Sequence, residues 1–114
     1  MTELIFYQYL NTVLNVPVYM EQPADPPADF VVLEKTGSST SNHIETATMA
    51  VQSYGGTMYQ AAVLNETVKQ YMDAAVALPQ VSSVKLNSDY NYTDTEAKRY
   101  RYQAVFDVIT LEEV

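Results

Sequence analysis

Side chains capable of catalysis are few in this chain, and none occurs in a recognisable catalytic pattern. The sequence holds one histidine, His43, and no cysteine. A catalytic triad or a metal site would have to be built around that histidine, and no nucleophile motif accompanies it. Geometry rather than residue type makes a functional site, so we interpret His43 as a polar residue where a loop enters a strand. The sequence predicts no enzyme, no catalytic residue, no cofactor and no metal.

Two further motifs resemble ligand sites. Gly55-Gly56 comes just before a predicted helix, as in sites that bind anions. It lacks the Lys-Ser/Thr of a P-loop and the spaced glycines of a dinucleotide fold, so a strand-to-helix turn explains it better. Residues 89–96 offer oxygen ligands at alternate positions, as calcium loops do, but Asp94 stands where such a loop needs glycine. We favour a turn whose Asp and Asn side chains bond their own backbone.

Tyrosines near the C-terminal end offer aromatic rings on which nucleic-acid bases could stack: Tyr90, Tyr92, Tyr100 and Tyr102. A base-stacking site also needs a basic groove. The formal net charge is −8, from 14 acidic and 6 basic residues. Such a surface repels phosphate, so we predict no specific nucleic-acid binding and assign the tyrosines to core and interface packing.

Three of the six basic residues lie together, at Lys98, Arg99 and Arg101. Arg99 and Arg101 are two positions apart on a predicted strand and therefore share a face. Carboxylates far outnumber cations, which favours charge-assisted pairing of these arginines with acidic groups within or between subunits. The interface residues that we predict are Tyr90, Tyr92, Arg99 and Arg101.

Hydrophobic spacing predicts the elements that position these side chains. Two helices are expected, at residues 2–15 with Thr2 as its cap, and from a capping box at Thr57 and Gln60 to about residue 77. Five strands are expected, at residues 16–20, 30–36, 43–54, 81–86 and 98–109. Pro17 confines the first strand to an edge or makes its start irregular. The order predicts an α+β fold, in which two helices pack on a mostly antiparallel sheet of about five strands.

The last strand has two distinct faces. The side chains expected on the core are Tyr100, Tyr102, Ala104, Phe106 and Val108. The opposite face carries Arg99, Arg101, Gln103 and Asp107. The connections at residues 21–29 and 37–42 are rich in proline or serine, so we expect both to be mobile and to become ordered against a partner. Residues 87–96 are expected to form a polar turn.

Length and hydropathy limit the organisation of the chain. Its 114 residues predict a single domain covering residues 1–114. No apolar run approaches the roughly 18 residues of a membrane span. The first residues lack the basic region of a signal peptide, so we expect a protein that stays in the cytoplasm where it is made, without membrane contact.

Read together, several segments resemble the small tail terminator, or tail completion, proteins of long-tailed phages and of prophages in Gram-positive bacteria. The likeness extends from Leu10 to Val108 and lies mainly in the order and spacing of its segments. These are residues 16–19 after the first helix, 31–37, 51–55 before the second helix, 86–87 and 91–94, and finally 100–106.

That resemblance implies a small α+β subunit that closes into a hexameric ring. The ring would cap the tail tube, stop its elongation and join it to the head connector protein, within a virion assembled in the bacterial cytoplasm. DNA would pass through the ring without being bound. Another head-to-tail connector or neck protein remains open as an alternative, and a small ligand-binding module or enzyme is the alternative of a different class.

Overall fold

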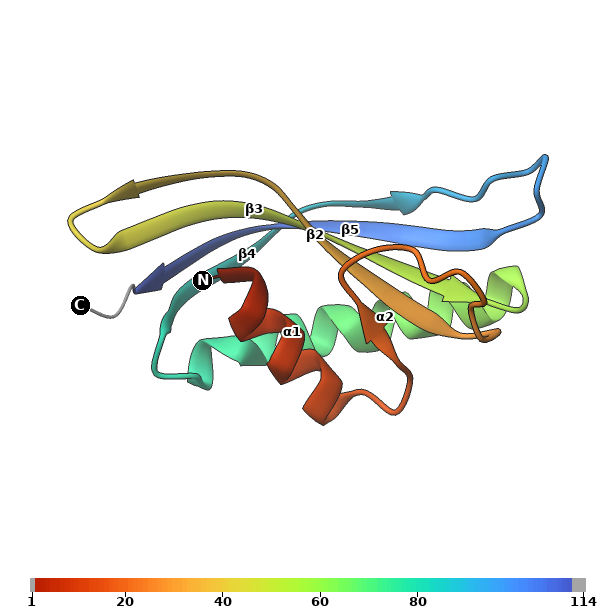
Figure 1. Ribbon diagram of the computed structural model, residues 1–114, viewed down its shortest axis with the longest axis horizontal. Coiled ribbons are helices and arrows are strands. Elements are labelled where there is room, and N and C mark those ends of the chain that lie inside the picture. Colours follow the sequence, from red (N-terminus) through yellow and green to blue (C-terminus); the bar gives the residue numbers. More distant parts are fainter. Residues whose placement is uncertain (1, 112–114) are drawn as a thin grey trace.

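The computed structural model describes residues 2–111. Two helices lie on one face of a five-stranded sheet, and the opposite face carries no helix (Figure 1). The helices are α1 (Thr2–Val13) and α2 (Met58–Ala74), and a 3-10 turn, η1 (Ala75–Ala77), follows α2. The strands are β1 (Val18–Tyr19), β2 (Phe30–Ser41), β3 (Ile44–Gly55), β4 (Val81–Asn91) and β5 (Tyr100–Leu111). The predicted class and element order are confirmed.

The strands lie in the order β1-β2-β3-β5-β4. The short strand β1 runs parallel to β2, and every other neighbouring pair is antiparallel. Pro17 lies just before β1 at the edge, as predicted, and its carbonyl accepts a hydrogen bond from the Val31 amide at 2.9 Å. Because three antiparallel pairings separate them, β2 and β4 run in opposite directions at the two sides of the sheet.

The core lies between the sheet and the two helices. Alternate residues of β5 enter it, namely Ala104, Phe106 and Val108, and they meet Phe6 of α1 and Met72 of α2 in one cluster. This periodicity confirms the predicted core face of the last strand for these three residues. Tyr100 and Tyr102 lie on the same side at the start of β5, but they are only half-buried.

The prediction of a mobile loop at residues 37–42 is wrong. Strand β2 continues to Ser41, and a two-residue turn of Asn42 and His43 returns the chain into β3. Both turn residues have positive φ, 53° and 64°, as the tight turns of hairpins require. His43 is therefore an exposed turn residue. The serine-rich sequence is typical of loops, but this part of the hairpin lies in solvent and needs no apolar side chains.

The last hairpin is also longer than predicted. Strand β4 reaches Asn91 instead of ending near residue 86, with a bulge between Leu86 and Ser88. The turn that follows bonds its own backbone: the Asn91 side chain accepts from the Thr93 amide, and Asp94 Oδ1 accepts from the amides of residues 96 and 97. Asp89, the first residue of the possible calcium loop, forms an ion pair with α2: its Oδ2 lies 2.6 Å from Nζ of Lys69. These bonds support the backbone-bonded turn over a calcium loop.

Helix α2 starts as its sequence predicts. The Thr57 hydroxyl accepts a hydrogen bond from the Gln60 amide at 3.1 Å, so one of the amides left unpaired at the helix start is satisfied. Residues 21–29 form an irregular connection between β1 and β2. Their mobility stays a prediction.

A Thr57→Ala variant is expected to lower the free energy of unfolding by about 1 kcal/mol, because the cap bond is lost. Equilibrium unfolding in urea measures this change. Thr67→Ala is the matched control, since Thr67 lies within α2 and bonds only the Val63 carbonyl one turn before it. If both variants lose the same stability, the cap bond contributes nothing of its own.

A buried polar cluster holds the start of α1 on the sheet. We call it the Glu45 cluster; its members are Thr2, Glu3, Lys35, Glu45 and Thr110. The Thr2 hydroxyl donates to Glu45 Oε1 at 2.5 Å and lies 2.8 Å from the Thr110 hydroxyl. The predicted cap residue therefore bonds the sheet. Lys35 Nζ lies 3.1 Å from Glu3 and 3.2 Å from Glu45.

Hydrogen bonds in the Glu45 cluster shift the pKa values of its members. The bond from Thr2 lowers the pKa of Glu45 the most, burial acts in the opposite direction, and Lys35 lowers it further. Bonds to Glu3 and then to Glu45 raise the pKa of Lys35. Both charges are therefore retained over the neutral range, although only 5% of the Glu45 surface is exposed.

Candidate interface on the open face of the sheet

The sheet face without helices, here called the open face, carries an aromatic group at one end. Phe30 and Tyr54 stack with ring centroids 4.3 Å apart and planes inclined by 7°. Tyr19 meets Phe30 edge-on at 5.9 Å. Both Phe30 and Tyr54 are buried, although no helix covers this side of the sheet. Strands β1, β2 and β3 thus share one apolar cluster there.

Arg101 of β5 connects that cluster to the tyrosines of β4. Its guanidinium donates to the Tyr54 hydroxyl at 2.7 Å and to the Tyr92 carbonyl at 2.7 Å. The same group lies 4.4 Å from the centre of the Tyr92 ring, within the range of a cation–π interaction. Tyr90 meets Tyr92 edge-on at 5.8 Å.

Amide side chains complete a network across all five strands. Gln52 donates to Gln103 at 2.8 Å, and the Tyr54 hydroxyl donates to Gln52 at 3.2 Å. Gln103 in turn donates to the Tyr90 hydroxyl. We call the whole set the aromatic network; its members are Tyr19, Phe30, Gln52, Tyr54, Tyr90, Tyr92, Arg101 and Gln103. A network with these bonds holds its side chains in place before any partner arrives.

Three of the four predicted interface residues are members of this network. Tyr90 and Tyr92 keep 41% and 44% of their surface exposed, so a partner can still reach their rings. Arg99 is separate: it lies in the turn before β5, where its backbone pairs with that of Asp94. Within residues 2–111, Arg101 bonds Tyr54 and Tyr92 and no carboxylate. An acidic partner for Arg101 in a neighbouring subunit stays a prediction.

Sequence reasoning missed five members of this site: Tyr19, Phe30, Gln52, Tyr54 and Gln103. Their contacts depend on which strands are neighbours and in which register. Tyr54 pairs with Arg101, and Gln52 with Gln103, only because β5 inserts beside β3. A signal was present in the alternation of β3, where Gln52 and Tyr54 fall on the face opposite Val51, but the pattern does not name the strand beside them.

An Arg101→Gln variant is expected to lose about 2 kcal/mol of folding stability, because both the cation–π contact and a charged hydrogen bond disappear. The matched control is Arg99→Gln, whose side chain is exposed in the turn and should change stability by less than about 0.5 kcal/mol. Urea unfolding of the two variants tests this difference. Equal losses would show that the network does not stabilise the subunit.

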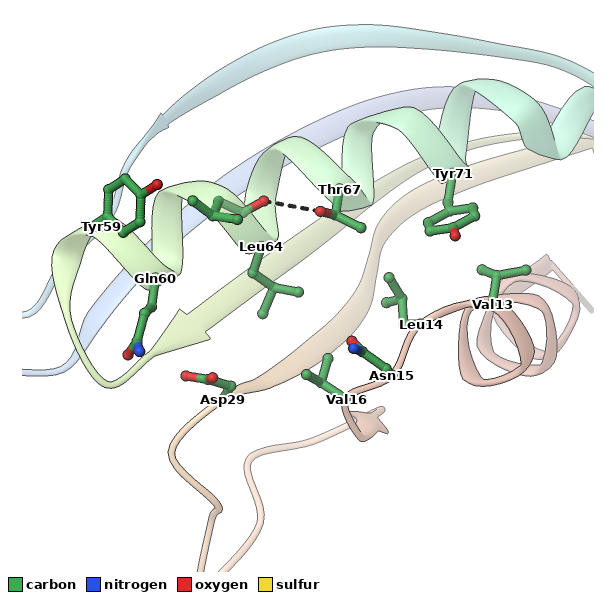
Figure 2. Close-up of a pocket in the computed structure, with 11 residues that line it drawn as sticks. Val13, Leu14, Asn15, Val16, Asp29, Tyr59, Gln60, Leu64, Thr67 and Tyr71 are labelled. Carbon is green, nitrogen blue, oxygen red and sulfur yellow. Dashed lines mark hydrogen bonds between the residues drawn. The ribbon is translucent and has the colours of Figure 1, made fainter.

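A groove of about 600 Å³ lies on the other side of the molecule, between α2 and the segment that joins α1 to β1. Figure 2 shows Leu64 and Tyr71 pointing from α2 toward Val16 and Val13. Its lining is largely apolar, and the Asp29 carboxylate at its end already accepts the Gly56 amide at 3.1 Å. The groove offers shape and apolar contact but no paired acid and base.

Across residues 2–111, no group of three or more His, Cys, Asp or Glu side chains is arranged as a metal site would be. Within the same residues, no helix combines the length and apolar character needed to cross a bilayer. Comparison with known protein families found no matching family model, and comparison with curated proteins found no match either. The open face thus offers ordered rings, amides and one guanidinium, which suit binding to another protein surface.

Proposed function

We propose that the chain is a structural subunit of a phage or prophage tail. In this proposal, copies of it close into a ring, hexameric by the resemblance, which caps the tail tube, ends its elongation and joins it to the head connector protein. Its partners are the tail tube protein, the connector protein and further copies of itself. Its place is the virion, assembled in the bacterial cytoplasm.

One structural observation supports a ring above all others. The sheet has one face free of helices, and beyond the two residues of β1 its long edges are β2 from Leu33 onward and β4, which run in opposite directions. A single repeated head-to-tail contact between two different surfaces generates a ring when the rotation closes. A sheet with two different edges offers such a pair of surfaces, and the exposed tyrosines of β4 lie beside one of them.

The charges of the open face agree with a channel that DNA passes without binding. This side carries two acidic side chains, Glu34 and Asp107, and two basic ones, Lys85 and Arg101, so its charges are balanced. The acids that make the whole chain negative lie elsewhere. We propose no specific nucleic-acid binding, because a balanced surface releases few counterions from a duplex.

Sedimentation over micromolar to millimolar concentrations, followed by electron microscopy of the purified protein, tests the ring. We expect closed rings of one size. Purified tail tubes mixed with these rings should carry a cap and stop growing, and capped tails should join separated heads. A protein that remains monomeric at every concentration and also ignores tube ends would contradict the proposal.

The same assays separate the alternatives. Rings that bind heads but leave tube growth unchanged would favour another connector or neck protein. The alternative of a different class, a small ligand-binding module or enzyme, would use the groove between α2 and the segment that joins α1 to β1. A monomer whose thermal unfolding shifts upward with small molecules would favour that reading.

A further inference from the structure

We propose that neighbouring copies join edge to edge, with the outer edge of β4 in one copy paired to residues 33–41 of β2 in the next. This inference rests on the proposed ring and names its subunit contact.

Both edges have unpaired backbone groups. Strand β1 pairs only with Val31 and Val32, so β2 has a neighbour on one side alone from Leu33 onward. Glu34 and all residues from 36 to 41 are exposed. On the other side of the sheet, the 11 residues of β4 pair with β5 alone. Exposed strand edges of this length readily accept another strand.

Strand direction favours a second copy as the occupant. Since β2 and β4 are antiparallel within one subunit, a rotation about an axis roughly along the strands sets β2 of the next copy antiparallel to β4. The new contact therefore continues the pattern that already joins β2 to β3, β3 to β5 and β5 to β4. Each copy would pair its β4 with one neighbour and its β2 with the other. The repeated contact could therefore close into a ring.

The two edges also carry opposite charges on the same face. Glu34 of β2 and Lys85 of β4 both point to the open face and are exposed, and neither takes part in an ion pair among residues 2–111. Asp107 lies across from Lys85 on β5, but its oxygens accept from Asn87 at 3.0 Å and Thr48 at 3.5 Å. Glu34 of one copy and Lys85 of the next are thus complementary.

Strand β4 and the residue that follows its last one also carry exposed apolar side chains. Leu86, Tyr90 and Tyr92 lie in or just after β4 with 50%, 41% and 44% of their surface exposed. Exposed tyrosines beside a strand edge are the residue type that anchors protein interfaces. When the edge of β4 lies in solvent, this apolar surface is exposed. A second copy paired along β4 would bury part of it.

The first test reverses the two charges. Glu34→Lys alone and Lys85→Glu alone should each raise the apparent dissociation constant of the ring about tenfold, since like charges then meet in every contact. The double variant restores an opposite pair and should return within about threefold of the original value. Asp73→Lys on the exposed surface of α2 is the matched control and should leave assembly unchanged. Double variants that assemble no better than the single ones would overturn the proposal.

The second test uses the absence of cysteine from the chain. In the proposed contact, Glu34 of one copy lies opposite Lys85 of the next. Because Thr36 is a bulge that pairs with no residue, Gly37 of the first copy then lies opposite Ser83 of the second, and both are on the open face. A Gly37→Cys/Ser83→Cys variant should therefore form disulfides between copies on oxidation. Denaturing gels should show a ladder that ends at the number of subunits in the ring. Ser38→Cys/Ser83→Cys places the thiols on opposite faces and should not cross-link.

The outcomes separate this contact from the ring itself. Rings visible by microscopy, with neither charge rescue nor cross-linking, would show that the ring closes through other surfaces. Cross-linked dimers from Gly37→Cys alone would show β2 pairing with itself, which also overturns the proposal. A protein that stays monomeric throughout and also ignores tube ends would contradict the proposed function instead.

Discussion

A Gly55→Ala variant is expected to lose about 3 kcal/mol or more of folding stability, or to fail to fold, because there is no room for a side chain at this turn. An added Cβ would lie 2.4 Å from the backbone nitrogen of Ala61 and 2.9 Å from its Cα. These are backbone atoms in the first turns of α2, so the whole helix would have to move away from the sheet.

Gly37→Ala is the matched control for this substitution. A Cβ at Gly37 would meet nothing within 4 Å, so we expect a change of less than about 0.5 kcal/mol. Circular dichroism confirms folding, and urea unfolding gives the free energies. If Gly55→Ala unfolds at the same urea concentration as the original protein, α2 is not held as closely to β3 as the structure shows.

The second large effect is expected from Glu45→Gln, which should lower the free energy of unfolding by about 2 to 3 kcal/mol at neutral pH. The substitution removes the charge that Thr2 and Lys35 share, and it leaves the Lys35 ammonium beside Glu3 alone. The start of α1 would lose its polar attachment to β3 while keeping Phe6 in the core.

This variant should also change the response to acid. Because the pKa of Glu45 is lower in the folded protein than its ordinary value of 4.5, its charge stabilises the fold fully above that value. The contribution disappears as the pH falls through the lowered folded pKa. Urea unfolding between about pH 3 and pH 7 should therefore show a shallower loss of stability for Glu45→Gln.

Glu66→Gln serves as the control for Glu45→Gln. Glu66 also pairs with a lysine, Lys69, at 2.7 Å, but 67% of its side chain is exposed. An exposed pair of this kind contributes less than about 1 kcal/mol. Equal acid sensitivity in both variants would show that the buried position of Glu45 has no special effect.

Local signals in the sequence predicted the parts of the fold that depend on near neighbours. The start of α2 followed from Thr57 and Gln60, and the core face of β5 from the alternation around Phe106. The edge position of β1 followed from Pro17. In each case one or two residues decide the structure through backbone chemistry or through burial at period two.

The strand ends and the interface partners could not be predicted in the same way. Beyond residue 36, β2 is exposed and polar, so neither hydrophobicity nor alternation marks it as a strand. The predicted interface needed the register between β3 and β5, since Arg101 meets Tyr54 only across that pair. Contacts between residues far apart in the chain leave no local pattern.

The central position of β5 has a consequence for the order of events during synthesis. It is the last strand in the chain, yet it lies between β3 and β4. On a ribosome, β3 therefore emerges with one backbone edge unpaired, long before the strand that pairs with it exists. Pairings across such long sequence separations form slowly. Until β5 has emerged, the backbone edges of β3 and β4 that pair with it stay open. In the proposed ring, a subunit could therefore join its neighbours only after β5 is in place.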